Sequence, residues 1–362
     1  MKSNVRKEKN LLRVGILGCG VICQAAHLIS ASKASNVTLE AICDVSQELR
    51  DKMAAIYEPR KVYDEYEKML EDPEIDAVII GNGDQFHVPC SKQAIRAGKH
   101  VLIEKALGVS IEAAKELQEL IEETDLVVQI GNMKRFDGGL QYAKEFVEQK
   151  IGEVTTFKGW YCDSMGRYQI TDNVMPVLYS SDEMKKPEGD PKRMKEKYYL
   201  LGHASHLFDT ARFFMGDIIS VQAQFVNKDE MYSWLIACEF SNGTIGNLNL
   251  VVSIAQDWHE GVEILGTEGT VYAKTFNPWE MRSSVVECCE RKTSNITTPF
   301  VADGDFYRRQ LEGFADTILN HAPQKGATAK DGIEAIKAIV ATYQSVHSGG
   351  TKVYIKDVTG EM

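Results

Sequence analysis

The 362-residue sequence predicts an α/β domain built on a parallel sheet, followed by an α+β domain with an open, mainly antiparallel sheet. Between residues 11 and 130, short apolar runs alternate with amphipathic helical patterns, which is typical of parallel strands wrapped by helices. After Gly131 the segments alternate polar and apolar residues and are separated by turn residues. Because the chain exceeds the usual size of one domain, we expect two domains, residues 1–131 and 132–362.

Each half contains elements that its pattern predicts. Apolar runs predict five strands in the first half, at residues 12–17, 38–43, 77–80, 100–103 and 126–130, and helical spacing predicts a helix at 111–123. In the second half we expect a helix at 139–150 and strands at 155–161, 218–226, 234–240 and 244–252. Residues 180–197 are polar, contain two prolines and show no clear period, so they predict a loop or lid.

Charge and composition exclude several classes of partner. The formal net charge of -11 disfavours nucleic acid and anionic membrane surfaces, because both bind through fields of Lys and Arg. No apolar stretch approaches the roughly 20 residues needed to span a bilayer. The eight cysteines are scattered and read as reduced thiols, and Cys288 and Cys289 point to opposite faces if they lie on a strand. We therefore expect a cytoplasmic globular protein.

A glycine-rich turn follows the first predicted strand. The segment Gly18-Cys19-Gly20-Val21-Ile22-Cys23 precedes a helical stretch, so Gly18 permits a tight turn and Gly20 lets the backbone approach a pyrophosphate at the helix N-terminus. Asp44 ends the second strand, where a carboxylate can accept both ribose hydroxyls. Since Val45 and Ser46 follow and offer no cation to a 2′-phosphate, the sequence predicts NAD as the cofactor rather than NADP.

Several motifs then resemble the glucose-fructose oxidoreductase and inositol dehydrogenase family, Gfo/Idh/MocA. They are Tyr63-Asp64-Glu65-Tyr66, Asp76 to Ile80, His87, Ala97 to Val101, Glu104-Lys105, Arg135-Phe136-Asp137, Ile151 to Val154, His206 to Asp209 and Gly266 to Thr270. The resemblance covers nearly the whole chain. It implies a Rossmann domain, a second domain whose open sheet carries the substrate pocket and oligomer contacts, and redox chemistry on secondary alcohols of sugars or polyols.

The resemblance also implies roles for individual residues. Lys105 matches a lysine near both nicotinamide and substrate, and His206 matches the histidine usually assigned as catalytic acid/base. The residues expected to bind the cofactor are Gly18, Gly20, Val21, Ile22, Asp44, Asn82, His87, Glu104, Lys105, Asn132 and Arg135.

Two positions depart from the family pattern. The proline that usually follows Glu-Lys is Ala106 here, which removes a rigid, often cis-prone bend and could relax the Lys105 loop. The catalytic aspartate that usually lies four residues before the histidine is Gly202. A carboxylate partner for the histidine must therefore come from elsewhere, or another group must do its work.

The residues themselves suit alcohol oxidation. Lys105 ends a parallel strand, where open α/β sheets bind ligands, and its ammonium can stabilise a developing alkoxide. His203, His206 and Asp209 share one helix face, so His206 can act as base and His203 as substrate donor or relay. The alternatives are a solvated lysine and structural histidines. A His-x-x-His zinc site is a further alternative, but no Cys or Glu partner is apparent nearby, so we predict no metal.

Polar and aromatic residues of the second half complete the expected substrate site. Alongside Lys105, His203 and His206 we expect Tyr161, Asp163, Arg167 and Trp258 to contact a carbohydrate, although core or interface packing would explain these aromatic residues equally well. An open sheet also predicts a homo-oligomer that associates through that face.

These observations predict an NAD-dependent oxidoreductase that acts on a CH–OH group of a sugar, glycoside or cyclic polyol. The two histidines and the polar insert favour a glycoside substrate, with oxidation at C3 of a glucoside as the first expectation. Three alternatives stay open: an inositol or free-sugar dehydrogenase, a redox-assisted glycosidase that retains NAD, and a non-catalytic nucleotide-binding regulator.

Overall fold

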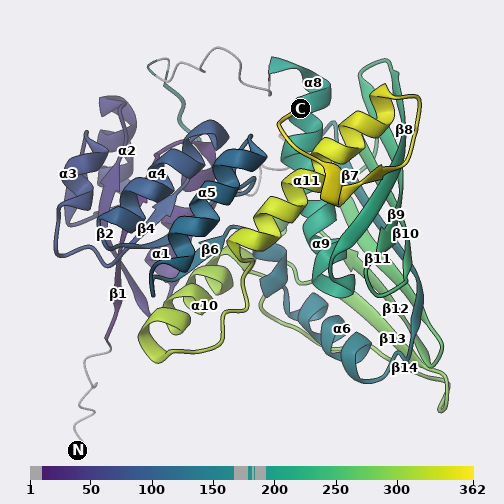
Figure 1. Cartoon of the computed structure of the whole chain (residues 1–362). Helices are drawn as coiled ribbons and strands as arrows, with labels where there is room; N and C mark the ends of the chain where they lie inside the picture. Colours follow the sequence, from purple (N-terminus) through teal and green to yellow (C-terminus); the bar gives the residue numbers. More distant parts are fainter. Residues whose placement is uncertain (1–9, 167–177, 182, 184–192) are drawn as a thin grey trace, which may run out of the picture.

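The first half of the chain forms a six-stranded parallel sheet in the order β3-β2-β1-β4-β5-β6 (Figure 1). The computed structural model describes residues 10–166, 178–181, 183 and 193–362. The strands are β1 (Leu12–Leu17), β2 (Val37–Cys43), β3 (Lys61–Tyr63), β4 (Ala77–Ile80), β5 (His100–Ile103) and β6 (Val128–Ile130). The predicted parallel sheet is confirmed, and β3 is a strand that the sequence pattern did not predict.

Helices connect these strands, and serine side chains begin two of them. The helices are η1 (Cys23–His27), α1 (Leu28–Lys33), α2 (Gln47–Tyr57), α3 (Tyr66–Leu70), α4 (Asp84–Arg96) and α5 (Ile111–Glu122). The Ser46 hydroxyl accepts from the Leu49 amide, and the Ser110 hydroxyl accepts from the Ala113 amide, each at 3.3 Å. Both serines therefore satisfy amides that the first helical turn leaves without partners.

The second half forms a nine-stranded sheet in the order β14-β13-β12-β11-β7-β10-β9-β8-β15. The strands are β7 (Val154–Ser164), β8 (Ile218–Lys228), β9 (Met231–Phe240), β10 (Ile245–Ile254), β11 (His259–Gly266), β12 (Gly269–Thr275), β13 (Val285–Glu290), β14 (Asn295–Thr297) and β15 (Val353–Tyr354). Only β7 and β10 pair in parallel among these described strands, so the mainly antiparallel sheet is confirmed. Cys288 is buried in β13, whereas Cys289 on the opposite face is half-buried.

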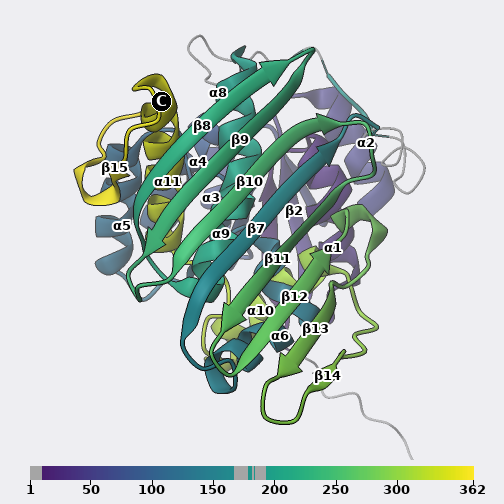
Figure 2. The ribbon, with the colours of Figure 1, turned by 90° about the vertical axis from the view of Figure 1, so that its right-hand side faces the viewer.

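Helices cover one face of this sheet and leave the other open (Figure 2). The helical segments of the second half are η2 (Met133–Phe136), α6 (Gly138–Gln149), α8 (Lys195–Tyr199), η4 (Leu200–Ala204), α9 (Ser205–Met215), η5 (Pro278–Glu280), α10 (Phe306–Asn320), α11 (Ala329–His347) and η6 (Ile355–Asp357). Helix α8 begins inside the predicted loop of residues 180–197, and residues 182 and 184–192 of that loop lie outside the described ones.

Two helices late in the sequence join the halves. Helix α10 packs against α1, β1 and β2, and its Leu311 and Phe314 share a core cluster with Val14 and Ile42. Helix α11 runs between the sheets and contacts both α5 and β8 (Figure 1). The domain boundary after residue 131 remains a prediction. Although α10 belongs to the second half of the sequence, it packs against the sheet of the first half.

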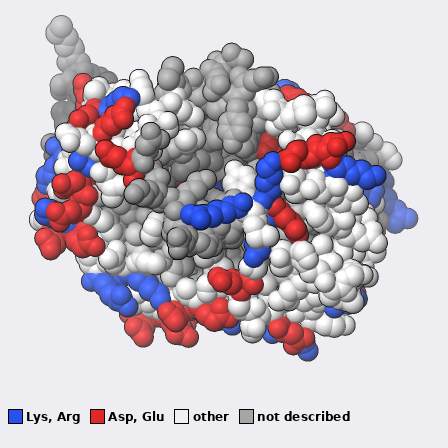
Figure 3. Space-filling view, turned by 90° about the horizontal axis from the view of Figure 1, so that it is seen from above, with Lys and Arg blue, Asp and Glu red and all other residues white. Residues whose placement is uncertain are grey.

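The surface seen from above mixes charges of both signs. On this face, Lys and Arg side chains of the described residues lie among Asp and Glu side chains along the margins (Figure 3). In the part of the chain that the structure describes, no helix combines the length and the apolar character that crossing a bilayer requires.

Candidate active site

The glycine-rich turn joins β1 to the first helix. Gly18 has a φ of +101°, a backbone conformation that residues with a side chain rarely adopt. A Cβ at this position would lie 3.1 Å from the backbone of Gly81. A Cβ on Gly20 would meet no described atom within 4 Å, so its backbone is open to a ligand. Val21 is exposed, and Ile22 is the residue before η1.

The close packing usually provided by a third glycine is provided here by Gly81, which the sequence analysis missed. The Cys23 thiol donates to the Gly81 carbonyl at 3.6 Å, and a Cβ on Gly81 would lie 2.4 Å from the Cys23 sulfur. The helix can therefore carry Cys23 at this position because Gly81, directly after β4, has no side chain. A glycine directly after the apolar run 77–80 was the available signal.

Asp44 is held next to this turn at the end of β2. Its carboxylate accepts from the Cys19 amide at 2.6 Å and from the Ser46 amide at 2.8 Å. Arg50 donates to the backbone carbonyl of Asp44 at 2.5 Å. The carboxylate thus has a fixed orientation beside the glycine-rich turn, as recognition of a ribose requires.

Residues 178–181, which we call the cover segment, lie against the same site. The Gln24 side chain accepts from the Tyr179 amide and donates to the Tyr179 carbonyl, both at 2.9 Å, and donates to the Cys19 carbonyl at 2.7 Å. The Ser46 hydroxyl donates to Ser181 at 2.9 Å. The cover segment is therefore bonded near both the glycine-rich turn and Asp44.

Buried polar groups surround the other end of the predicted cofactor site. Glu104 contacts His27 Nε2 at 2.9 Å and accepts from the Lys105 amide at 3.1 Å. The ring nitrogens of His87 face the carbonyls of Ala106 at 2.6 Å and Asn82 at 3.1 Å, so His87 holds the Lys105 loop to the start of α4.

The structure also offers buried atoms that a cofactor could satisfy. Within the described residues, the side-chain oxygens of Asn82 and Asn132 are buried without a hydrogen-bond partner. Buried polar atoms normally have partners, so these two acceptors fit a bound group that brings donors. Together with the open backbone at Gly20 and the fixed Asp44 carboxylate, they fit a dinucleotide.

Lys105 extends from the end of β5 toward the second half of the chain. Its ammonium donates to the Gly202 carbonyl at 3.0 Å. The peptide bond between Lys105 and Ala106 is cis. A ring nitrogen of His87 contacts the Ala106 carbonyl, and the relaxation of this loop expected from Ala106 stays a prediction.

His203 has both a hydroxyl and a carboxylate nearby. Its Nδ1 lies 3.1 Å from the Tyr161 hydroxyl, and its Nε2 lies 3.6 Å from Asp163 Oδ2. All three residues are nearly inaccessible to solvent. Asp163 on β7 therefore places a carboxylate in the site whose family aspartate is replaced by Gly202.

His206 is buried one turn further along the chain, in α9. Burial lowers the pKa of its imidazole well below the usual value, and the positive charges of Lys134 and Lys105 lower it further, as does His203. Its ring stacks on Tyr161 at 5.9 Å between centroids and 9° between planes. The structure thus keeps His206 neutral, the form in which it can accept a proton.

A buried ion pair beside these histidines was not predicted. Lys134 of η2 bonds to Glu260 of β11, and the Trp258 indole donates to the other Glu260 oxygen at 2.8 Å. The tilted Trp258 ring lies 5.4 Å from the Tyr161 ring. Lys134 and Glu260 are 126 positions apart, so only the fold brings them together.

Two expected site residues stand apart from this cluster. The Arg135 guanidinium donates to Asp209 at 2.8 Å and to Asp331 at 3.2 Å, so its side chain joins η2 to α9 and α11. The expected cofactor contact of Arg135 stays a prediction. Arg167 lies outside the described residues.

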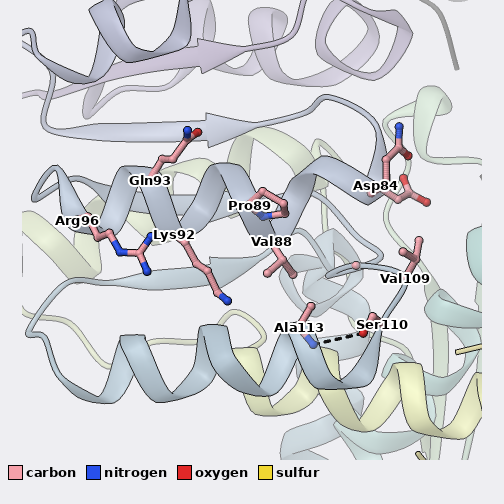
Figure 4. Close-up of a pocket in the computed structure, with 11 residues that line it drawn as sticks. Asp84, Val88, Pro89, Lys92, Gln93, Arg96, Val109, Ser110 and Ala113 are labelled. Carbon is pink, nitrogen blue, oxygen red and sulfur yellow. Dashed lines mark hydrogen bonds between the residues drawn. The ribbon is translucent and has the colours of Figure 1, made fainter. Parts of the chain in front are cut away.

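A separate groove of about 410 Å³ lies between α4 and α5 (Figure 4). Its walls include Val88, Lys92 and Arg96 of α4 and Ala113 of α5. None of the predicted catalytic residues lines this groove, so it is distinct from the site of Lys105 and His206.

The parallel sheet, the glycine-rich turn, the half-buried Lys105 and the buried His203 and His206 define a Rossmann-fold oxidoreductase. A family model described as an oxidoreductase family with an NAD-binding Rossmann fold matches residues 12–132, and one for the GFO/IDH/MocA C-terminal domain matches residues 140–272. The chain therefore belongs to the Gfo/Idh/MocA family of NAD-dependent oxidoreductases, and its reaction class is oxidation or reduction at CH–OH groups.

Individual relatives agree with this assignment. The inositol 2-dehydrogenase/D-chiro-inositol 3-dehydrogenase of Shouchella clausii is 30% identical over 358 residues, which cover 93% of this chain and 92% of that protein. The scyllo-inositol 2-dehydrogenase (NAD(+)) of Bacillus subtilis is 28% identical over 280 residues, 71% of each chain. A crystal structure of scyllo-inositol dehydrogenase from Lactobacillus casei shares the fold with a TM-score of 0.74, at 24% identity, and covers 96% of this chain and 100% of its own.

Proposed function

We propose that this protein is an NAD-dependent dehydrogenase of a cyclic polyol of the inositol class. The main supporting observation is the 3.0 Å hydrogen bond from the Lys105 ammonium to the Gly202 carbonyl. This bond brings the lysine at the edge of the parallel sheet to the helical turn that carries His203 and His206. In this proposal Lys105 and His206 are catalytic and His203 assists. The inositol dehydrogenase names of the relatives support this substrate class over C3 of a glucoside, the first expectation from the sequence.

The chemistry follows from the groups around the site. Oxidation of a secondary alcohol removes a hydride from carbon and a proton from oxygen, and bound NAD⁺ supplies the hydride acceptor. Lys105 donates a hydrogen bond to the reacting oxygen and stabilises its developing negative charge. Neutral His206 accepts the hydroxyl proton at its unprotonated ring nitrogen. His203, placed by Tyr161 and Asp163, orients a second hydroxyl of the ring.

A substrate panel tests this proposal. The purified protein is incubated with NAD⁺ and with myo-, scyllo- or D-chiro-inositol, methyl glucosides or free hexoses, and NADH formation is followed. We expect oxidation of at least one inositol, and a loss in Lys105→Ala of roughly 10²–10⁴-fold in kcat, the usual contribution of such a group. Lys158→Ala on the exposed part of β7 is the control. Preference for a glucoside, or full activity of Lys105→Ala, would overturn the proposal.

A second candidate is a redox-assisted glycosidase that retains its NAD, and the cover segment is the observation that favours it. Hydrogen bonds from Gln24 to Tyr179 tie this segment beside the dinucleotide site. Protein that absorbs like NADH after purification and cleaves a glycoside without added NAD⁺ would support this candidate. Stoichiometric NADH release into solution would exclude it.

We also propose that the chain forms a homo-oligomer through the open face of the nine-stranded sheet. That face is uncovered in Figure 2 and exposes Leu235, Ile245 and Tyr272 from three different strands. Light scattering during size exclusion tests this, since Leu235→Lys should reduce the mass to that of one chain. The cytoplasmic location expected from the sequence stays a prediction.

A further inference from the structure

The ion pair between Lys134 and Glu260 lies at the junction of the two halves. Lys134 belongs to η2, directly after the last parallel strand, and Glu260 belongs to β11 of the large sheet. Only 5% and 7% of their side-chain surfaces are exposed. Burying two charges is costly unless they are paired and hydrogen-bonded, so such a pair requires a defined geometry. The Trp258 indole supplies the further hydrogen bond to Glu260.

This pair contacts the ring that separates the two histidines. Glu260 is directly opposite Tyr161 in the register of β11 and β7. The Lys134 ammonium lies 4.8 Å from the centroid of the Tyr161 ring, a cation–π distance. The same ring stacks on His206, and its hydroxyl bonds to His203. A shift of Lys134 would therefore reach both histidines through Tyr161.

The charge of Lys134 also acts on His206. The titratable groups described around His206 are Lys105 after β5, Lys134 on η2, Tyr161 on β7, His203 on η4 and Asp209 one turn along α9. Lys134 is the charged neighbour that contributes most to the lowered pKa of His206, after burial itself. Glu260 pairs with this charge, and Lys134 is the member of the pair that lies over the Tyr161 ring.

We propose that Lys134 and Glu260 are a positioning pair that fixes Tyr161 between His203 and His206 and keeps His206 in its neutral, proton-accepting form. The inference rests on the proposed function, in which His206 is the base. Neither residue needs to touch substrate. Their role is to set the plane of the histidine and its protonation.

The variants Lys134→Met, Lys134→Arg and Lys134→Met/Glu260→Gln separate charge from position. In Lys134→Met the positive charge that lowers the pKa of His206 is gone, so the acid limb of kcat/KM against pH should move up by about one unit. Its kcat should fall roughly 10- to 100-fold, with KM changed less than kcat, because a displaced base affects the chemical step most. Lys134→Arg should restore most of the rate.

The double variant carries no net charge at the pair, like the wild type. It nevertheless lacks the Lys134 ammonium that lowers the pKa of His206, so its acid limb should also lie above that of the wild type, while kcat stays low because Tyr161 has lost its support. It also keeps the inference testable if Lys134→Met fails to fold, since replacing a buried ion pair by neutral groups is often tolerated. The more exposed pair Lys158 and Glu263 joins β7 to β11, the strands that carry Tyr161 and Glu260. Lys158→Met is therefore the matched control.

An NMR titration of the His206 ring in the same proteins requires no substrate. An upward shift in the pKa of His206 in Lys134→Met would support the positioning pair even if the protein oxidises no polyol. Failure to oxidise any polyol would count against the proposed function and not against the positioning pair. Unchanged His206 titration together with wild-type kcat in the double variant would overturn the inference. A loss of rate in Lys134→Met with no change in pH profile, and no rescue by Lys134→Arg, would do the same.

Discussion

The ammonium of Lys105 donates a 3.0 Å hydrogen bond to the carbonyl oxygen of Gly202, the position at which the family pattern has an aspartate. A backbone oxygen thus contacts the lysine while no side chain adds charge at that position. The carboxylate of the region comes from Asp163, on a different element, and approaches His203. The departure at Gly202 therefore changes where negative charge lies in the site.

Restoring a carboxylate at Gly202 should change the pH profile. A Cβ there meets no described atom within 4 Å, so Gly202→Asp fits its surroundings. A nearby negative charge favours imidazolium, and we expect the acid limb of kcat/KM to rise by roughly half to one pH unit. Gly202→Ala is the control, which should leave the limb unchanged and stabilise this helical position by about 0.5–1 kcal/mol. Equal pH profiles for both variants would contradict the prediction.

Gly81→Ala should disturb the dinucleotide site from the strand beside it. The new Cβ would lie 2.4 Å from the Cys23 sulfur, so η1 must move away from β4. We expect a loss of about 1–3 kcal/mol in unfolding free energy, as for other overpacked cores, and weaker NAD binding. Urea unfolding and NAD titration measure the two effects. Adding Cys23→Gly should recover much of both losses, and no recovery would show that the Cys23 contact is not their cause.

Gln24→Ala should speed the release of NAD. The variant loses two hydrogen bonds to Tyr179 and one to the Cys19 carbonyl, which attach the cover segment beside the glycine-rich turn. If the net effect is that of one or two hydrogen bonds, NAD dissociation should become roughly tenfold faster. Stopped-flow fluorescence of bound NADH measures this rate. Gln93→Ala on the exposed part of α4 is the control, and an unchanged rate in Gln24→Ala would count against a covering role.

His206 should make the folded protein sensitive to acid. Burial holds the pKa of its imidazole well below the unfolded value of 6.5, so below that pH the unfolded chain binds a proton that the native protein does not. Stability from this residue is thus complete above about pH 6.5 and falls by up to about 1.4 kcal/mol per pH unit as the pH drops. When His206→Gln is unfolded in urea between pH 5 and 7.5, its unfolding free energy should change less with pH than that of the wild type. His321→Gln, at an exposed position, should keep the wild-type slope.

The sequence predicted the central strands well because their signal is local. β1, β4 and β5 match the predicted residues, since each is a mostly apolar run between polar segments. β3 was missed because Lys61-Val62-Tyr63 is short and exposes its only aliphatic side chain. The packing of α10 on the first sheet was also missed, because a helical pattern reveals an apolar face without indicating which sheet it covers.

For the candidate site, too, the sequence predicts what is local and misses what distant segments bring together. Gly18 and Asp44 belong to a compact motif, and the structure places both at one turn. The environment of His206 could not be predicted, because Lys134 and Tyr161 come from distant segments. The partners of Arg135 could not be predicted either, since resemblance to a motif does not reveal that Asp209 and Asp331 hold its guanidinium.

The position of β7 has a consequence for synthesis of the chain. β7 is the first strand of its sheet in sequence but the middle one in space, flanked by β10 and β11. While the ribosome makes residues 165–244, Phe157 and Tyr161 therefore have neither strand neighbour against which they finally pack. A nascent chain with an unpaired apolar strand is prone to aggregation, so chaperone demand should peak before β11 emerges. The strand that carries Tyr161 is thus synthesised well before both of the strands that flank it.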